Sequence, residues 1–414
     1  MAAGGQPRAH DTPTMNTAQA TFSSAHSDSS LLAERLELGA LVTLFGVAVF
    51  TQLSIAIAQS FLAIAVACWA ALIIVRHERI EVPRFFWPLV VYAVATLVST
   101  AFSMHPRVSL VASKQLVLFL IIPIAYRLMI GGRGLTMLTV ITSAGALSAA
   151  LGIFQYGLLH YDQLSQRPQG TLGHYMTYSG LLMLVIGVAT ARLLFGRRER
   201  IWSALVMPAL AIAIALTLSR NAWVGATTAV ALLIAMKDFR LLVVLPVIAL
   251  IVFVLAPATV TQRVASMFDL NDPTTRDRVA MVREGEHMVR DHPLVGVGPD
   301  MVKERYAEYR DPLAVKPINP HLHNVPIQIA AERGLPALAA WLAFVVVLGA
   351  GLVRQFRDGQ HRALTAAALA ALAATLAAGM FEHNFGDSEF LMLFLIVVTL
   401  PFAAARSTGT TDHA

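Results

Sequence analysis

Apolar runs long enough to cross a membrane make up most of this chain, and they limit its fold more than any other feature. A membrane-spanning helix needs about 20 mostly apolar residues. Candidate spans lie at 37–54, 56–75, 86–103, 111–130, 135–158, 174–194, 201–218, 221–236, 240–256, 323–353, 362–381 and 387–405. The sequence therefore predicts an all-α polytopic membrane protein with about twelve transmembrane helices, because a helix satisfies its own backbone hydrogen bonds inside lipid.

Composition supports the same class. Of the 414 residues, 57% are hydrophobic and 14% are charged, whereas soluble domains are about a quarter charged. The single cysteine, Cys68, lies inside an apolar run. This excludes a disulfide framework and a cysteine-based metal site.

The predicted spans divide the chain into five parts. Residues 1–35 lack the apolar core of a signal peptide and predict a disordered cytoplasmic tail. Residues 36–256 and 321–405 hold the predicted transmembrane helices 1–9 and 10–12. Between them, 257–320 is a long polar interval, and 406–414 form a second cytoplasmic tail.

Positive charge predicts the orientation. With the N-terminus inside, the inner segments hold clusters such as Arg76, Arg79 and Arg84, whereas the short outer loops and their edges hold only Arg107, Lys114, Arg167 and Arg220. Lys and Arg accumulate on the cytoplasmic side of membrane proteins. We therefore expect both termini inside and the interval 257–320 outside the cytoplasm.

The interval 257–320 predicts a small lid with two amphipathic helices. Thr274 followed by Asp277 resembles an N-terminal capping box, and Asp300 could cap the second helix. Valines recur at helical spacing in the first helix, at Val279, Val282 and Val289. No strand precedes the Gly-x-Gly at Gly296, so a dinucleotide site is not expected. After the lid, Gly334-Leu335-Pro336 predicts a kink in the overlong segment 323–353.

Two arginines are candidates for binding phosphate. Arg220 occupies an outer turn between two spans, and the planar fork of arginine suits a pyrophosphate. The alternative is an interfacial arginine that snorkels beside Trp223. Arg278 shares a helical face with Val282, so it is the lid arginine expected to turn inward. Its alternative is a solvated face with internal ion pairs.

His321 and His323 are candidates for a general base, because histidine titrates near neutral pH. A structural histidine or a metal ligand is the alternative. Metal binding needs a third ligand, and no His-x-x-Glu or Asp-x-Asp spacing occurs, so we expect no metal. Two outer loops reach the same side, 167–174 and 382–387, and for most of their residues simple loop polarity is the expected explanation.

Together these segments resemble the O-antigen ligase and polymerase superfamily of bacterial inner membranes. The matching segments are Thr217–Trp223, Arg278 with His292–Gly298, His323-Asn324 with Gln328 and Glu332-Arg333-Gly334, and Arg167 with Gly170-Thr171. The resemblance implies a metal-independent, cofactor-free glycosyltransferase whose donor is a lipid-pyrophosphate-linked glycan.

By the same resemblance, His323 would be the general base, and Arg220 and Arg278 would hold the pyrophosphate. His321, Asn324 and Arg167 complete the expected substrate-binding set. The chain departs from the family pattern at Val282, where an aromatic residue is common, and His321 offers a competing base.

Within the superfamily, the motif set and the compact lid are most similar to the ligase. That enzyme transfers O-antigen from undecaprenyl pyrophosphate to lipid A-core at the periplasmic face, and no nucleic acid takes part. An O-antigen polymerase is the first alternative, and a protein O-oligosaccharyltransferase is the second. A transporter would place polar residues near mid-membrane and contain an internal repeat, but the middles of these spans are nearly uncharged.

Overall fold

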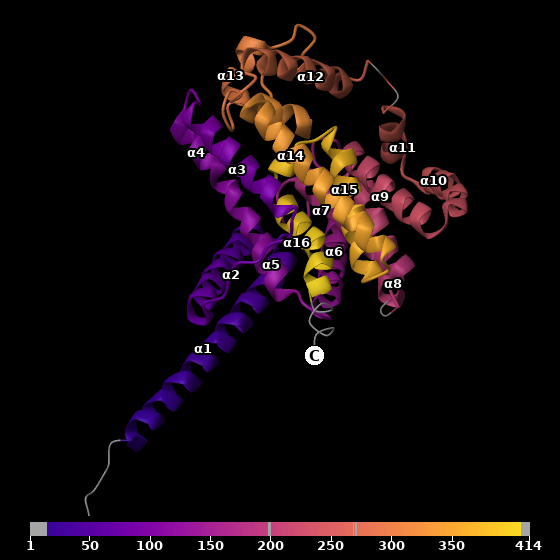
Figure 1. Ribbon diagram of the computed structural model, residues 1–414. Coiled ribbons are helices and arrows are strands. Elements are labelled where there is room, and N and C mark those ends of the chain that lie inside the picture. Colours follow the sequence, from indigo (N-terminus) through magenta and orange to yellow (C-terminus); the bar gives the residue numbers. More distant parts are fainter. Residues whose placement is uncertain (1–14, 198–199, 268, 270, 407–414) are drawn as a thin grey trace, which may run out of the picture.

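The computed structural model describes residues 15–197, 200–267, 269 and 271–406, and within these ranges helices account for all regular structure (Figure 1). The α-helices are α1 Met15–Phe50, α2 Ile55–Arg76, α3 Phe86–Ala101, α4 Pro106–Ser113, α5 Ile121–Leu128, α6 Arg133–Leu158, α7 Tyr175–Phe195, α8 Arg200–Leu216, α9 Arg220–Asp238, α10 Val244–Leu255, α11 Ala258–Ala265, α12 Pro273–Asp291, α13 Val302–Tyr309, α14 Val325–Arg357, α15 Arg362–Gly379 and α16 Ser388–Arg406. Short 3₁₀ helices are η1 Lys114–Leu120, η2 Phe239–Val243 and η3 Asn384–Gly386. The all-α prediction is confirmed.

In the part of the chain that the structure describes, 7 helical segments are long and apolar enough to cross a membrane. They are Ile55–Arg76, Pro106–Leu128, Arg133–Leu158, Tyr175–Phe195, Val325–Arg357, Arg362–Gly379 and Ser388–Arg406. An eighth candidate joins α9 and η2 to α10 across a bend of 75°. The protein is therefore a polytopic helical membrane protein.

The count of about twelve spans stays a prediction. α3 and α8 are apolar but only 16 and 17 residues long. α1 carries Glu34, Arg35 and Glu37 just before its apolar part. α1 also begins at Met15, so it differs from the disordered tail expected for 1–35. Residues 1–14 and 407–414 lie outside the described ranges.

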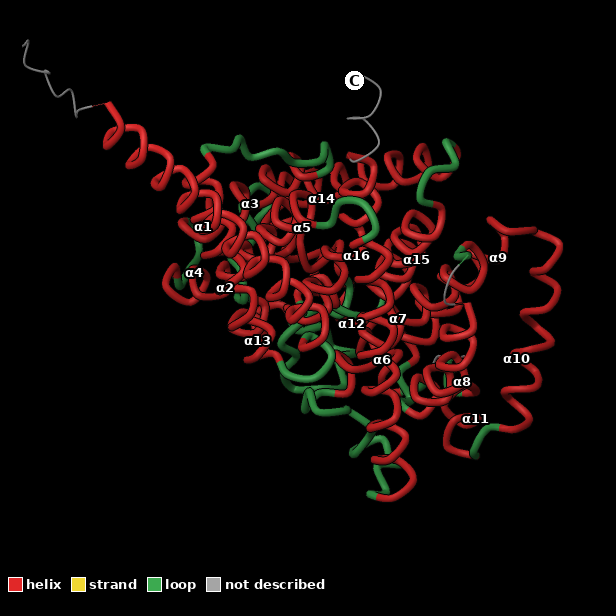
Figure 2. The backbone as a smooth tube through the Cα atoms, turned by 90° about the horizontal axis from the view of Figure 1, so that it is seen from below, coloured by secondary structure: helices red, strands yellow, loops and turns green. Residues whose placement is uncertain are grey.

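α7, α15 and α16 form the centre of the bundle, and most of their side chains are buried. Small residues allow neighbouring helices to approach closely. A Cβ on Gly225 of α9 would lie 2.0 Å from Sδ of Met183 in α7. By contrast, α10 stands apart at the edge of the bundle (Figure 2), where Leu250, Val254 and Leu255 are exposed.

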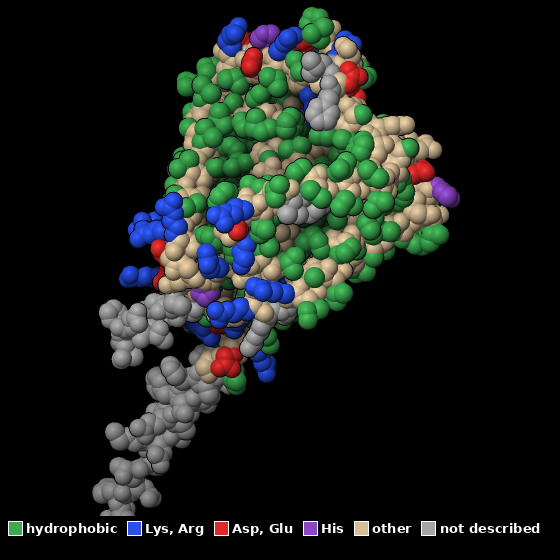
Figure 3. Space-filling view, turned by 90° about the vertical axis from the view of Figure 1, so that its right-hand side faces the viewer, with side chains coloured by type: hydrophobic (Ala, Val, Ile, Leu, Met, Phe, Trp, Pro, Cys, Tyr) green, Lys and Arg blue, Asp and Glu red, His purple; other side chains and the backbone are tan. Residues whose placement is uncertain are grey.

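The two ends of the bundle differ in their charged groups (Figure 3). Below the apolar band, Lys and Arg side chains gather at the end of the bundle opposite α12 and α13. There Arg127 donates to Glu78 at 2.7 Å and Arg76 to Glu37 at 2.8 Å. This end contains the loops expected to face the cytoplasm. Its sidedness stays a prediction.

α12, α13 and the segment 310–320 form a cap over one end of the bundle, called the lid below (Figure 1). Met281 and Met288 of α12 pack with Leu322 and with Ala331 of α14. The segment 310–320 is tied to α12 through Asp277, which accepts backbone N–H groups of Val315 at 2.9 Å and Lys316 at 3.1 Å.

Both predicted lid caps are wrong. Asp272, not Thr274, caps α12, and its carboxylate accepts the N–H groups of Thr274 and Thr275 at 3.0 and 3.1 Å. Pro273 explains the shift, because proline suits the first helical position and leaves the preceding residue as the cap. Asp300 does not cap α13; it adopts φ 62°, and its N–H donates to Glu332.

The kink predicted at Gly334-Leu335-Pro336 is present, since Gly334 interrupts α14 with φ 80° and ψ 170°. There the loop after α12 crosses α14. A Cβ on Gly296 would lie 2.3 Å from the carbonyl carbon of Glu332, and one on Gly334 would lie 2.2 Å from the carbonyl oxygen of Leu294. Leu335 N–H also donates to Pro293 O at 2.8 Å. These glycine-containing segments therefore hold the lid on α14.

Candidate functional site

Three adjoining cavities lie between the lid and the helical bundle, and His323 and Asn221 line all of them. The polar cavity is about 450 Å³ and is lined by residues such as Thr177, Asn319, His321, Glu382, His383, Asn384 and Asp387. The arginine cavity is about 340 Å³ and is lined by Arg167, Arg220, Arg263 and Arg278. The apolar cavity is about 320 Å³ and is lined by Val224, Met267, Val279, Val282, Met380 and Phe381 beside Arg220 and Arg278.

Arg220 begins α9, directly after a turn in which Leu218 adopts the left-handed conformation, φ 54°. Its side chain is buried and donates to Ser266 O at 2.9 Å and to Asp272 Oδ1 at 3.2 Å. Asp272 also caps α12. The same carboxylate therefore joins the start of α9 to the start of the lid.

Arg278 projects from α12 into the space shared by the arginine and apolar cavities. No hydrogen bond or ion pair joins its guanidinium to another residue that the structure describes. Burial lowers the pKa of Arg278, the charge of Glu382 opposes that change, and the charge of Arg220 adds to it. The group has donors free for an anionic ligand, which would relieve its repulsion from Arg220.

Arg263 was not found by sequence reasoning, because no recognisable pattern surrounds it. It follows α10 in the short helix α11, and its Nε donates to Leu218 O at 3.4 Å. Burial and then the charges of Arg220 and Arg167 lower the pKa of Arg263 to about 10. Arg167, which sequence did predict, stacks over Tyr175 with its Cζ 4.1 Å from the ring centroid. The arginine cavity thus concentrates more positive charge than its carboxylates neutralise.

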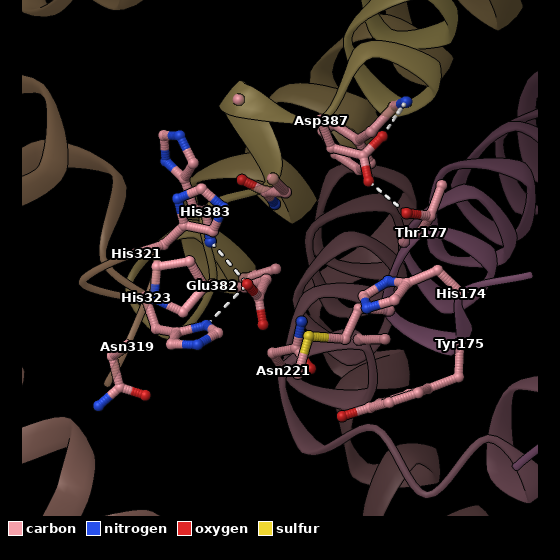
Figure 4. A pocket seen from close by; sticks show the side chains of 18 of the residues that line it. His174, Tyr175, Thr177, Asn221, Asn319, His321, His323, Glu382, His383 and Asp387 are labelled. Carbon is pink, nitrogen blue, oxygen red and sulfur yellow. Dashed lines mark hydrogen bonds and ion pairs between the residues drawn. The ribbon is translucent and has the colours of Figure 1, made fainter. Parts of the chain in front are cut away.

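His323 lies in the turn before α14 and adopts φ 48°, the left-handed region that is costly for a residue with a Cβ. Its Nδ1 is 2.8 Å from Oε1 of Glu382, in the loop between α15 and α16 (Figure 4). When Nδ1 carries the proton, it donates to Glu382 and leaves Nε2 as a proton acceptor. Nε2 has no partner among the described residues.

Glu382 is a second residue whose importance sequence reasoning missed, because its loop was attributed to simple polarity. The carboxylate also accepts the backbone N–H of His383 at 3.0 Å. Burial would raise the pKa of Glu382, but the charge and hydrogen bond of His323, the N–H of His383 and the charge of Arg278 together hold it below its usual value. Glu382 is therefore a carboxylate that can orient His323.

The competing histidine, His321, borders only one of the three cavities, the polar cavity. Its ring centroid is 5.1 Å from that of His383, and burial lowers the pKa of His321. Of the two histidines, only His323 borders both the arginines and the polar cavity.

The side chain of Asn324 holds the start of α14 in place through two hydrogen bonds. Its Oδ1 caps α14 by accepting the N–H of Ile327 at 3.1 Å, and its Nδ2 donates to Met380 O at 3.2 Å. These bonds tie the start of α14 to the loop that carries Glu382. The predicted contact of Asn324 with substrate stays a prediction.

Among the residues that the structure describes, no three His, Cys, Asp or Glu side chains are grouped to hold a metal ion. The family model described as O-antigen ligase matches residues 204–342. This match supports membership of the O-antigen ligase and polymerase superfamily. Membership implies a glycosyltransferase-like enzyme that processes O-antigen in lipopolysaccharide biosynthesis and acts on lipid-linked glycans in a membrane.

The O-antigen ligase match includes Arg220, Arg263, Arg278, His321, His323 and Asn324. Arg167 and Glu382 lie outside it. No curated protein matches the chain in sequence. The part of the site that lies outside the O-antigen ligase match therefore depends on the geometry described above.

Proposed function

We propose that the protein is an O-antigen ligase that transfers a glycan from undecaprenyl pyrophosphate to a sugar hydroxyl of lipid A-core. The observation that carries the proposal is the position of His323, which lines both the arginine cavity and the polar cavity. Arg220 and Arg278 can bind the pyrophosphate through their planar forks. The apolar cavity, which they also line, suits the first part of the polyprenyl chain.

The reaction begins at the acceptor hydroxyl, which is a poor nucleophile until it loses its proton. Nε2 of His323 takes that proton while the hydroxyl oxygen forms a bond to the anomeric carbon. The bond from that carbon to the pyrophosphate oxygen breaks, and the electron pair leaves with the pyrophosphate. Arg220 and Arg278 stabilise the developing charge. Direct attack inverts the anomeric configuration.

An O-antigen polymerase is the alternative, because it would use the same donor and the same base with a second lipid-linked glycan as acceptor. A lipopolysaccharide gel of a deletion strain distinguishes the two. Loss of the whole ladder with accumulated lipid-linked polymer supports the ligase, whereas a band with a single repeat supports the polymerase. Complementation with the wild-type gene restores the ladder, and complementation with His323→Ala does not.

We also propose that the site faces the periplasm. Glu286 is exposed on α12, and Arg357 is exposed at the far end of α14. In a Cys68→Ser background, Glu286→Cys should react with an impermeant maleimide in intact spheroplasts, and Arg357→Cys should react only after lysis. The reverse pattern would invert the topology and contradict a periplasmic site.

A further inference from the structure

The polar cavity contains buried polar atoms that lack partners. Within the described ranges, these atoms are Asn319 Oδ1, His321 Nδ1, Glu382 Oε2, His383 Nδ1, and both Nδ2 and Oδ1 of Asn384. All five residues line the cavity, and Figure 4 shows the side chains that surround it. Buried polar groups are nearly always hydrogen-bonded. Donors and acceptors gathered around one cavity therefore point to an occupant that hydrogen-bonds.

The charge of the polar cavity differs from that of its neighbour. Among the described residues that line it there is no arginine, and the one lysine, Lys316, is exposed. Its carboxylates are Glu382 and Asp387, and Asp387 accepts the hydroxyl of Thr177 at 2.5 Å. Burial lowers the pKa of His321, and it lowers that of His383 still further, so both imidazoles are neutral. Neutral imidazoles and amides suit hydroxyl groups, whereas the carboxylates would repel a phosphate.

The chemistry of transfer places the two substrates on opposite sides of the reacting carbon. In an inverting displacement, the nucleophile enters opposite the leaving group. The arginine cavity takes the pyrophosphate, and the polar cavity adjoins it, because both are lined by Asn221 and His323. An acceptor hydroxyl in the polar cavity therefore reaches the same histidine from outside the arginine cavity.

We propose that the polar cavity is the acceptor site and that it binds an uncharged sugar residue through its hydroxyl groups. The assignment rests on the proposed function, and it adds the chemical class of the reacting acceptor unit. The cavity's volume of about 450 Å³ lies within the range of roughly 300–1,000 Å³ that is usual for ligand pockets. Asn384 is a determinant of acceptor binding.

Asn384→Ala is the test variant, because neither amide atom has a partner among the residues that the structure describes, and so the change removes no hydrogen bond seen there. Asn271→Ala, at an exposed asparagine before α12, is the matched control. Binding of delipidated core oligosaccharide is measured by saturation-transfer difference NMR on purified full-length protein. Binding of undecaprenyl pyrophosphate is measured separately by thermophoresis. Neither measurement depends on transfer.

We expect Asn384→Ala to weaken oligosaccharide binding about tenfold, the cost of one or two hydrogen bonds, and to leave undecaprenyl pyrophosphate binding unchanged. Enzymatic dephosphorylation of the oligosaccharide should not weaken its binding to the wild type. Unchanged oligosaccharide binding in Asn384→Ala, or a requirement for phosphate, would overturn the assignment. Failure of the proposed function would appear differently, as wild-type protein that binds both ligands but transfers no glycan.

Discussion

The imidazole Nδ1 of His323 lies 2.8 Å from Oε1 of Glu382, which is 59 residues later in the chain. The carboxylate of Glu382 is buried, and burial alone would raise its pKa. His323, the N–H of His383 and the charge of Arg278 outweigh burial and hold the pKa below its usual value. An ionised partner at this position fixes which imidazole nitrogen carries the proton. The proposed base, His323, is thus oriented by a residue from another helix connection.

Glu382→Gln should lower kcat, because the amide can present its NH₂ group to Nδ1 and favour the wrong tautomer. A loss of roughly 10–100-fold is expected for such an orienting partner, with the affinity for undecaprenyl pyrophosphate unchanged. Nitrogen-15 NMR of histidine-labelled protein should show a smaller population of the Nδ1–H tautomer at His323. Glu304→Gln, at an exposed site on α13, is the control. An unaltered tautomer with reduced kcat would indicate a structural role only.

His323→Ala should abolish transfer while donor binding survives, because the base acts on the acceptor proton and not on the pyrophosphate. A general base contributes about 10²–10⁴-fold, so the residual rate should be about a hundredth or less. The assay is transfer of glycan to lipid A-core by purified protein. His287→Ala, at an exposed histidine on α12, should retain activity. If His321→Ala is inactive and His323→Ala is active, His321 is the base.

Arg220→Lys and Arg278→Lys should each weaken binding of undecaprenyl pyrophosphate about tenfold or more, because lysine keeps the charge but loses the bidentate fork. Arg276→Lys is a matched control, since Arg276 is exposed on α12 two positions before Arg278. Thermophoresis with the purified variants measures the affinities. If Arg220→Lys and Arg278→Lys bind undecaprenyl pyrophosphate as tightly as the control Arg276→Lys, the arginine cavity does not bind pyrophosphate.

The raised pKa of Glu284 predicts that the stability of the lid depends on pH. Burial raises the pKa of Glu284 although the N–H of Asp311 donates to its Oε1 at 2.9 Å. A carboxyl whose pKa is higher in the folded state holds its proton better there, so folding stability falls as pH rises through the interval above its usual pKa of 4.5.

Glu284→Gln should therefore gain thermal stability relative to the wild type as pH increases from about 4 to 7. Differential scanning fluorimetry in detergent measures the difference at each pH. Glu286→Gln, at an exposed site two positions away, should show no such trend. A constant difference between Glu284→Gln and the wild type at all pH values would contradict the raised pKa.

Transfer should not require a divalent metal, because the arginine cavity can neutralise the charge of a diphosphate leaving group, a task that metal ions perform in other enzymes. Activity of the purified protein should persist in excess EDTA. Magnesium or manganese that restores activity after its loss in EDTA would refute this prediction. It would direct attention to Glu382 and Asp387 as ligands.

The helical membrane class was evident from the sequence, because hydrophobic runs of span length are a local property of the chain. The break at Gly334 was also predictable, since proline and glycine act on the backbone around them. The ends of the helices were harder to predict from the sequence. Asp272 replaced Thr274 as the cap of α12 because Pro273 occupies the first turn, and the lengths of α3 and α8 leave the number of spans a prediction.

Residue chemistry was enough to name Arg220, Arg278 and the pair His321 and His323 as candidates, because a fork that fits phosphate and a ring that titrates near neutral pH are properties of the side chains themselves. The resemblance to the superfamily favoured His323 within that pair. Only the tertiary structure decided how they meet. It paired His323 with Glu382, added Arg263 beside Arg220, and separated an arginine cavity from a polar one. These relations join residues from different helix connections, and packing of the helices, not spacing along the chain, sets the distances between them.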